Sequence, residues 1–256
     1  RAEFSLLKPI ILKLKKLKKK KINLILVVTG THLSKNFGYT IKEILNSNIK
    51  VDYRINLKII KTSSIDVARY LANGVEKFAK LLKLTKPDLL LILGDRYEIF
   101  AAAISSTIMN IPIAHIHGGE ITKGAIDDVF RHSISKMAHL HFTSTNIYRK
   151  RLLQMGENQD NVFNVGSLGV ENLKNMKLHG KTYLEKKLKI KFQKKILLIT
   201  IHPETRSLDL NKNKIKILLT SLDKLEDTTL IFTGSNADKD GELINQEIKK
   251  FVIKRN

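Results

Sequence analysis

Residues 88–120 read DLLLILGDRYEIFAAAISSTIMNIPIAHIHGGE, and this stretch decides the fold class. It begins with the continuously apolar run DLLLIL (88–93), which is typical of a strand that is covered on both faces of a sheet. Residues 97–109 follow with helical periodicity, and a second strand is predicted at 112–117. Strand, helix and strand in this order predict a βαβ unit, in which the two strands run parallel.

The same alternation of strands and helices continues on both sides of this unit. Further strands are predicted at 22–29, 51–57, 140–144 and 162–165, and a further helix at 65–84. After a lysine-rich stretch, a second series is predicted, with strands at 196–201 and 229–233 and helices at 211–225 and 240–253. The sequence therefore predicts an α/β protein of two Rossmann-like domains with doubly wound parallel sheets. The predicted boundaries are 1–175 for the N-terminal domain, 176–194 for a linker and 195–256 for the start of the C-terminal domain.

Both ends of the sequence favour a truncated chain. It begins with Arg1 rather than Met and enters a predicted helix with no strand before it. The second series stops after two strands and two helices, which leaves an open sheet edge. We therefore expect the first strand and most of the second domain to be missing.

The composition excludes several classes of protein and site. The sequence has no cysteine, so disulfides, thiolate metal sites and a cysteine nucleophile are excluded. No apolar run approaches the roughly 18 residues of a membrane-spanning helix, and the start lacks the features of a secretory signal. A soluble cytoplasmic protein that does not bind membranes is expected.

The formal net charge of +22 admits two interpretations. The densest group of lysines, at 13–21, lies on a segment whose apolar residues recur at helical spacing. This group is either the solvated face of an amphipathic helix or a patch for nucleic acid or a membrane. No aromatic residue lies between these lysines, which weakens the case for binding single strands. We expect the solvated helix face, and no nucleic-acid partner.

Three polar groups of residues follow predicted strands. TGTH (29–32) ends one strand, GDR (94–96) follows a second and HGGE (117–120) ends a third. Ligands of doubly wound sheets bind beyond the carboxyl ends of the strands, so these groups are predicted to meet at one edge. Asp95 either projects into that crevice or caps the helix that begins near Tyr97, and the sequence leaves both interpretations open.

Charged residues also open the next predicted helix. Asp127 and Asp128 stand at its beginning, where the helix dipole favours negative charge. Asp127 and Arg131 are four residues apart and share a helix face, with His132 beside them. The pair is either an acid–base unit at the mouth of the sheet or a salt bridge on the helix surface.

The histidines are interpreted from their positions. His115 and His117 alternate on a predicted strand and face opposite ways, so His115 is expected to be buried and hydrogen-bonded, and His117 to face the crevice. His202 lies past a strand of the second series, either in the cleft between the domains or on an exposed loop. The sequence contains no HExxH, GxGxxG or GxxxxGK[ST] motif, so we expect no metal and no cofactor.

Several motifs together resemble one enzyme family. RAEFSLLKP, TGTHLSKNFG, GDRYE, HIHGGEITKGAIDDVFRHSISKMAHLHFTST, NVGSLGVENL and ITIHPET stand in the order seen in hydrolysing UDP-N-acetylglucosamine 2-epimerases, above all in the branch for bacterial sialic- and legionaminic-acid synthesis. The resemblance implies two Rossmann-like domains as in glycosyltransferase-B enzymes. It also implies a reaction. The UDP-sugar loses UDP by anti elimination across C1–C2, and water adds to the glycal to release the 2-epimeric free sugar. A homodimer or higher homo-oligomer is implied as well.

The resemblance assigns roles to individual residues. Asp95 matches an acid/base aspartate, Asp127 an acidic residue of the family's pair, and Arg131 the arginine that follows. The substrate-binding positions that it implies are Arg1 at the nucleotide, His32 at the sugar, and His202 at the diphosphate and sugar. His202 is expected to be a catalytic residue as well.

One position departs from the family pattern. Several relatives carry a catalytic glutamate where this chain has His117, so either the imidazole transfers the proton or Glu120 does. The serine- and glycine-rich loop of the family's second domain has no match after Thr233. We therefore expect the parent gene product to be an active epimerase and this chain of 256 residues to be weak or inactive.

Two other functions stay open. One is a nucleotide-sugar glycosyltransferase of the same architecture, which would need an acceptor. The other is a non-catalytic basic module that binds through the lysines at 13–21. No residue decides between UDP-N-acetylglucosamine and a 2,4-diacetamido-trideoxy sugar nucleotide as the substrate.

Overall fold

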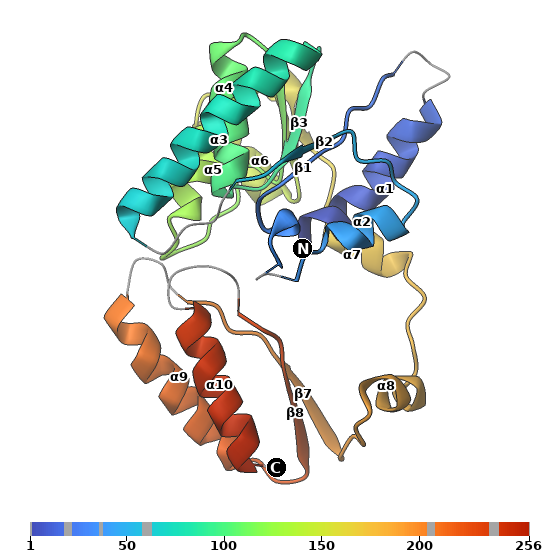
Figure 1. Cartoon of the computed structure of the whole chain (residues 1–256), viewed down its shortest axis with the longest axis vertical. Coiled ribbons are helices and arrows are strands. Elements are labelled where there is room, and N and C mark those ends of the chain that lie inside the picture. The colour runs from blue at the N-terminus through green and yellow to red at the C-terminus, as the bar shows by residue number, and fades with distance from the viewer. Residues whose placement is uncertain are drawn as a thin grey trace. The chain divides into compact units, whose positions relative to one another are not determined.

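The computed structural model describes residues 2–17, 22–35, 38–57, 63–203, 208–235 and 241–255. The chain divides into two compact units. Unit 1 comprises Arg1–Lys123 and Asp127–Asn175, and unit 2 comprises Gly124–Ile126 and Met176–Asn256. Each unit has its own parallel strands and helices, so each is described by itself (Figure 1).

Unit 1 contains two parallel sheets. The first pairs β1 with β2, and the second has the strand order β3-β4-β5-β6. The strands are β1 (Val27–Thr29), β2 (Tyr53–Ile55), β3 (Leu90–Leu93), β4 (Ile113–Ile116), β5 (Leu140–Thr143) and β6 (Val162–Asn164). Every described pairing is parallel, which confirms the α/β class.

The helices of unit 1 are α1 (Ala2–Lys16), α2 (Ile41–Asn46), α3 (Ser64–Thr85), α4 (Tyr97–Ile108), α5 (Asp127–Met137), α6 (Asn146–Gln154) and α7 (Leu168–Lys174), with short 3-10 turns η2 (Gly30–Leu33) and η4 (Gln159–Asn161). Helices α2 to α6 connect the strands, α1 precedes them and α7 follows them. Each of α4, α5 and α6 joins neighbouring strands of the four-stranded sheet in the same direction. Because such crossovers are right-handed, these three helices lie on one face of that sheet. The core between this sheet and helices α4 and α5 contains Ile92, Ala103, Ile113, Ile134 and Ala138.

Apolar side chains on both faces of β1 pack against helices, and Val28 at its centre is buried. Val28 packs into a cluster with α1 and α2, whereas its neighbour Val27 packs into a cluster with α3 and α4. Helices α3 and α4 lie side by side (Figure 1) and approach closely at Gly74. A Cβ atom added there would lie 2.9 Å from the Cβ of Ala101.

Unit 2 is built on two parallel strands, β7 (Lys195–Ile199) and β8 (Thr228–Phe232). Its helices are α8 (Lys181–Leu188), α9 (Leu208–Asp223) and α10 (Gly241–Arg255). Figure 1 shows α9 and α10 side by side along this sheet, and their core of Ile215, Leu219, Leu222, Ile244 and Ile248 packs against it. On the strand face away from this core, Ile196 and Leu198 are 44% and 70% exposed.

Several predicted boundaries differ from the observed ones. The strand predicted at 22–29 begins only at Val27, because the amide of Leu26 donates to the Asp52 carboxylate at 2.9 Å instead of entering the ladder. Helix α1 carries the first of the clustered lysines with Ile11 buried on its other side, as expected for an amphipathic helix, while 18–21 lie outside the described residues. No helix in the described part of the chain is long and apolar enough to cross a membrane.

Candidate functional site at the strand ends of unit 1

Three strands of unit 1 end at tight turns with left-handed backbone. Gly30 follows β1 with φ +63°, Gly94 follows β3 with φ +83°, and His117 follows β4 with φ +65°. A side chain at Gly30 would overlap the Glu98 carboxylate, so the end of β1 lies against the first turn of α4. The three polar sequences TGTH, GDR and HGGE therefore all stand at the carboxyl ends of strands in unit 1.

Arg131 connects the ends of β3 and β4. Its Nη2 donates to Asp95 Oδ2 and, at 2.9 Å, to Thr122 Oγ1, while its Nη1 lies 3.7 Å from Asp128 Oδ1. The residue is only 8% exposed. The N-cap position of α4 belongs to Arg96, so Asp95 serves in a buried ion pair rather than as the helix cap.

Burial controls the ionisation of Asp95. It raises the pKa of this carboxyl, and the nearby Glu120 acts in the same direction, while Arg131 and Arg96 oppose the effect. A carboxyl with a raised pKa takes up a proton more readily than an ordinary aspartate, so Asp95 is a candidate for proton transfer.

Asp127 has a different partner from the one predicted. The expected pair with Arg131 across one helical turn is replaced by Asp128, three residues before Arg131. Asp127 Oδ1 instead lies 3.8 Å from Arg96 Nη1, which comes from the turn after β3. Asp128 also accepts the amide of Thr122 at 2.8 Å, so it fixes the loop before α5.

His117 and Glu120 lie together after β4. His117 Nδ1 is 3.5 Å from Glu120 Oε1, and Ser144 Oγ donates to the same carboxylate oxygen at 2.7 Å. Burial lowers the pKa of His117, and Arg131 adds to this effect, while Glu120 opposes it. The imidazole is therefore held neutral, in the form that accepts a proton.

His115, on β4, bonds to the turn after β3 and to α5. Its Nε2 faces the carbonyl oxygen of Gly94 at 2.9 Å and its Nδ1 lies 3.2 Å from Ser135 Oγ. A carbonyl only accepts, so Nε2 carries the proton. Complete burial lowers the pKa of His115 to about 4. The expectation of a buried, hydrogen-bonded histidine is confirmed.

The two glycines after His117 are packed against protein atoms. A Cβ at Gly118 would lie 2.8 Å from Ser135 Oγ, and one at Gly119 would lie 2.6 Å from the carbonyl oxygen of Tyr148. Arg151 Nη1 also donates to the carbonyl oxygen of Gly119. The glycines therefore allow this turn to dock onto α5 and α6, which fixes the backbone beside the site.

The three predicted substrate-binding residues lie in different parts of the chain. His32 lies in η2, with Nδ1 2.8 Å from Thr40 Oγ1. His202 is an exposed residue of unit 2, and Arg1 lies outside the described residues. In the described part of the chain, no group of three or more metal-ligating side chains is placed to hold a metal ion.

The sequence interpretation missed Ser144, Thr122 and Arg96, which hold Glu120, Arg131 and Asp127. Ser144 directly follows β5, just as the predicted polar groups follow their own strands, so the same positional signal would have found it.

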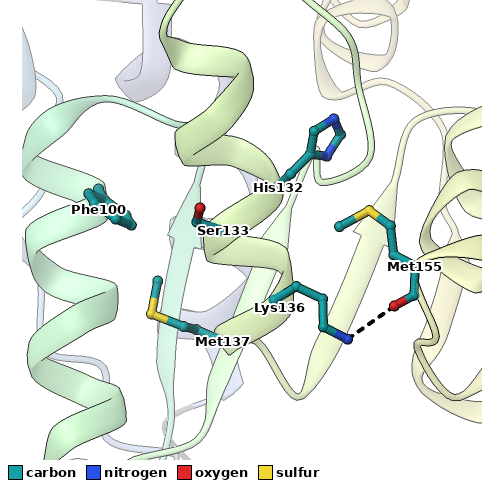
Figure 2. Close-up of a pocket in the computed structure, with 6 residues that line it drawn as sticks. All are labelled: Phe100, His132, Ser133, Lys136, Met137 and Met155. Carbon is teal, nitrogen blue, oxygen red and sulfur yellow. Dashed lines mark hydrogen bonds between the residues drawn. The ribbon is translucent and has the colours of Figure 1, made fainter.

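A hollow lies over α5. Its volume is about 460 Å³. Figure 2 shows the residues that line it, which are Phe100, His132, Ser133, Lys136, Met137 and Met155. It contains none of the predicted site residues. Within it Lys136 Nζ donates to the carbonyl oxygen of Met155 at 3.2 Å (Figure 2).

Several proteins of known name are similar to this chain. It is 44% identical to the GDP/UDP-N,N'-diacetylbacillosamine 2-epimerase (hydrolyzing) of Campylobacter jejuni over 92% of the chain and 61% of that protein. It is 37% identical to the polysialic acid biosynthesis protein P7 of Escherichia coli over 98% of the chain and 64% of that protein. It is 31% identical to the UDP-N,N'-diacetylbacillosamine 2-epimerase (hydrolyzing) of Legionella pneumophila over 98% of the chain and 66% of that protein. The chain thus spans less than two thirds of the length of these relatives.

The fold has solved counterparts as well. The structure superposes with a TM-score of 0.78 and 22% identity on UDP-GlcNAc 2-epimerase from Neisseria meningitidis bound to UDP-GlcNAc, over 100% of this chain and 68% of that one. The family model described as UDP-N-acetylglucosamine 2-epimerase matches residues 15–255. Because this match covers nearly the whole sequence, the chain belongs to the UDP-N-acetylglucosamine 2-epimerase family.

Proposed function

We propose that the protein is a hydrolysing UDP-sugar 2-epimerase, which converts a UDP-2-acetamido sugar and water into UDP and the 2-epimeric free sugar. One observation carries this proposal. A carboxyl with a raised pKa, Asp95, and a neutral imidazole, His117, follow adjacent strands β3 and β4, and each has a charged partner. The family membership supports the same reaction.

The proposed reaction needs groups that transfer protons and groups that carry positive charge. In the elimination step the C2–H bond breaks, its electron pair forms the C1=C2 bond, and the C1–O bond breaks so that its electrons leave with UDP. In the second step water supplies hydroxyl to C1, and a proton is added to C2 on the other face. A base, an acid and cationic groups near the leaving diphosphate are required.

We assign the residues accordingly. Asp95, His117 and Asp127 are the proposed proton-transfer groups, Glu120 is the second candidate after β4, and Arg131 holds Asp95. We propose that Arg1, His32 and His202 bind substrate, as the family resemblance implies, with His202 also near the reacting diphosphate.

The proposed substrate is a UDP-2,4-diacetamido-trideoxyhexose of the N,N'-diacetylbacillosamine kind. Two of the relatives above are named for this sugar, and one of them is 44% identical to this chain. The product would be the precursor of a legionaminic- or sialic-type acid. We further propose a cytoplasmic enzyme that acts as a homo-oligomer.

Incubation of the complete gene product with UDP-N,N'-diacetylbacillosamine in D₂O, without any acceptor, tests the proposal. We expect equimolar UDP and a free 2-epimeric sugar that carries deuterium at C2. A parallel reaction with UDP-N-acetylglucosamine decides the sugar. A glycosyltransferase would release no free epimer without an acceptor, so a protein that forms none from either substrate contradicts the proposal.

A further inference from the structure

The end of β4 offers two groups for proton transfer, the imidazole of His117 and the carboxylate of Glu120. The contacts of the two groups differ, and this difference indicates different roles in proton transfer. Glu120 Oε1 has Ser144 Oγ at 2.7 Å on one side and His117 Nδ1 at 3.5 Å on the other. His117 has one ring nitrogen directed at this carboxylate, and a second one that is not.

The position of the His117 ring is set by the backbone. The amide of His117 donates to the carbonyl oxygen of Phe142 at 2.9 Å, and its φ of +65° is uncommon for a residue with a side chain. The packed glycines that follow prevent the turn from shifting. Strained backbone of this kind is found where the side chain must be aimed.

The second ring nitrogen of His117, Nε2, has different surroundings from Nδ1. His117 Nε2 is buried and has no hydrogen-bond partner among the described residues, while the whole side chain keeps 15% exposure. A buried polar atom without a partner is costly, and in a site of ionisable groups it marks an atom that waits for a ligand. The other charged or titratable groups near this ring are Arg131 and His115.

We propose that His117 Nε2 is the atom that transfers the proton, and that Glu120 and Ser144 are positioning residues. In this assignment the proton of the neutral ring is on Nδ1, the nitrogen that lies 3.5 Å from the Glu120 carboxylate, so the lone pair of Nε2 is free, and Ser144 holds Glu120. This inference rests on the proposed epimerase function. In the elimination step Nε2 takes the C2 proton, the C2–H electrons form the C1=C2 bond, and the C1–O electrons leave with UDP.

The first test needs no catalysis. Nitrogen-15 NMR of histidine-labelled chain should show His117 with the proton on Nδ1 and a bare Nε2. Glu120→Gln should lower the pKa of His117, because it removes a carboxylate that favours the charged ring. The matched control is Glu157→Gln, since Glu157 Oε2 lies 3.2 Å from His141 Nε2 in the same kind of pair. Its effect should be confined to His141. A proton on Nε2, or an unchanged His117 titration in Glu120→Gln, would overturn the pairing.

The second test uses kinetics of the complete gene product. Glu120→Gln should lower kcat by about 10- to 100-fold with KM within about twofold, as for other residues that orient a reacting group. The acid limb of its kcat/KM profile should move to lower pH, since the base is then less easily protonated. Ser144→Ala should give a smaller loss of kcat in the same direction, and His117→Gln a loss of about 10²- to 10⁴-fold. Glu157→Gln should leave the profile unchanged.

The reverse pattern would overturn the assignment. If Glu120 itself transfers the proton, Glu120→Gln abolishes turnover and His117→Gln retains most of it. A wild-type protein that releases no UDP from either sugar nucleotide defeats the proposed function and the proton-transfer role together. In that event the NMR result still decides the pairing of His117 with Glu120.

Discussion

Arg131 is the residue that joins the separate parts of the site, because it contacts Asp95, Thr122 and Asp128 from a nearly buried position. Replacing it with methionine keeps much of the side-chain volume but leaves the Asp95 carboxylate without its cation. Removing one partner of a buried pair costs about 3 kcal/mol, so Arg131→Met should lower the free energy of unfolding by about this amount.

Urea denaturation measures this loss of stability. The control is Lys80→Met, which removes an exposed ion pair between Lys80 and Glu76 on α3 and should leave the midpoint unchanged. Equal midpoints for Arg131→Met and Lys80→Met would show that the Asp95 pair is screened by solvent like a surface pair.

His115 makes the stability of unit 1 dependent on pH. The pKa of this ring is about 4 in the folded protein, against the ordinary value of 6.5 in an unfolded chain, so between these values the unfolded chain binds more protons. The contribution of His115 to the free energy of unfolding is therefore fully present above pH 6.5, the pKa in the unfolded chain. It is lost as the pH falls from 6.5 towards 4, and the loss is about 3 kcal/mol for a shift of this size. His115→Gln, which can still donate to Gly94, should remove this part of the dependence.

The measurement is the difference between the two unfolding free energies at several pH values. His117 and His141, whose pKa values are also lowered, contribute to both proteins and cancel, as do the raised carboxyls of Asp95 and Glu98. A difference that stays constant from pH 7 to about pH 4 would show that His115 is protonated in the folded state.

The sequence predicted the chemical types at the site better than their pairing. Asp95, His117, Asp127 and Arg131 follow directly from their places after strands or at a helix start. The partner of Arg131 could not be predicted in this way. Local helix geometry favoured Asp127, four residues away, whereas the observed partner Asp95 is 36 residues away. Contacts of that kind depend on which strands are neighbours, and single-sequence periodicity does not contain this information.

At the scale of elements, helix α3 meets α4 through a glycine that lacks room for a methyl group. Alanine normally improves a helix interior over glycine by about 1 kcal/mol. At Gly74 the new Cβ would lie 2.9 Å from the Cβ of Ala101, which is completely buried and cannot move aside. Overpacking of this kind costs about 1–3 kcal/mol, so Gly74→Ala should be destabilising by about 1 kcal/mol overall.

A glycine of α7 provides the matched control. At Gly169 the added Cβ would make ordinary contacts of 3.6 Å with Leu6 and Ser167. Gly169→Ala should therefore stabilise unit 1 slightly through helix propensity. Thermal unfolding of both variants measures the sign of each change. A stabilised Gly74→Ala protein would mean that α3 and α4 separate easily.

The elements themselves were largely predictable, and their ends were not. The eight strands in the described part of the chain lie within or within one residue of predicted ones, because continuous apolar runs between polar turns are a strong signal. The observed end of a strand differs from the predicted one where a side chain bonds a backbone group that the strand would otherwise use. The Asp52 carboxylate accepts the amide of Leu26 in this way. The separation of β1 and β2 from the other four strands as a sheet of their own left no signal in the periodicity.

At the scale of the whole molecule, a lysine-rich segment joins the two units. Residues 173–191 are all exposed except Glu185, which is partly buried. Lys177, Lys189 and Lys191 should therefore be cleaved by trypsin before the lysines inside α3, whose backbone is hydrogen-bonded in a helix. Mass spectrometry of an early time point identifies the first cuts. Earlier cleavage within α3 would contradict the compactness of unit 1. The domain boundaries predicted at 175 and 195 stay a prediction.

The exposed face of β7 in unit 2 also affects whether copies of the protein associate in solution. Copies of a chain with 22 excess positive charges repel one another at low ionic strength, although Ile196 and Leu198 are uncovered on that strand. Added salt shortens the range of this repulsion to about 10 Å at 0.1 M, and the apolar strand faces can then approach. Dilute buffers should therefore keep concentrated samples clear, and high salt should make them turbid.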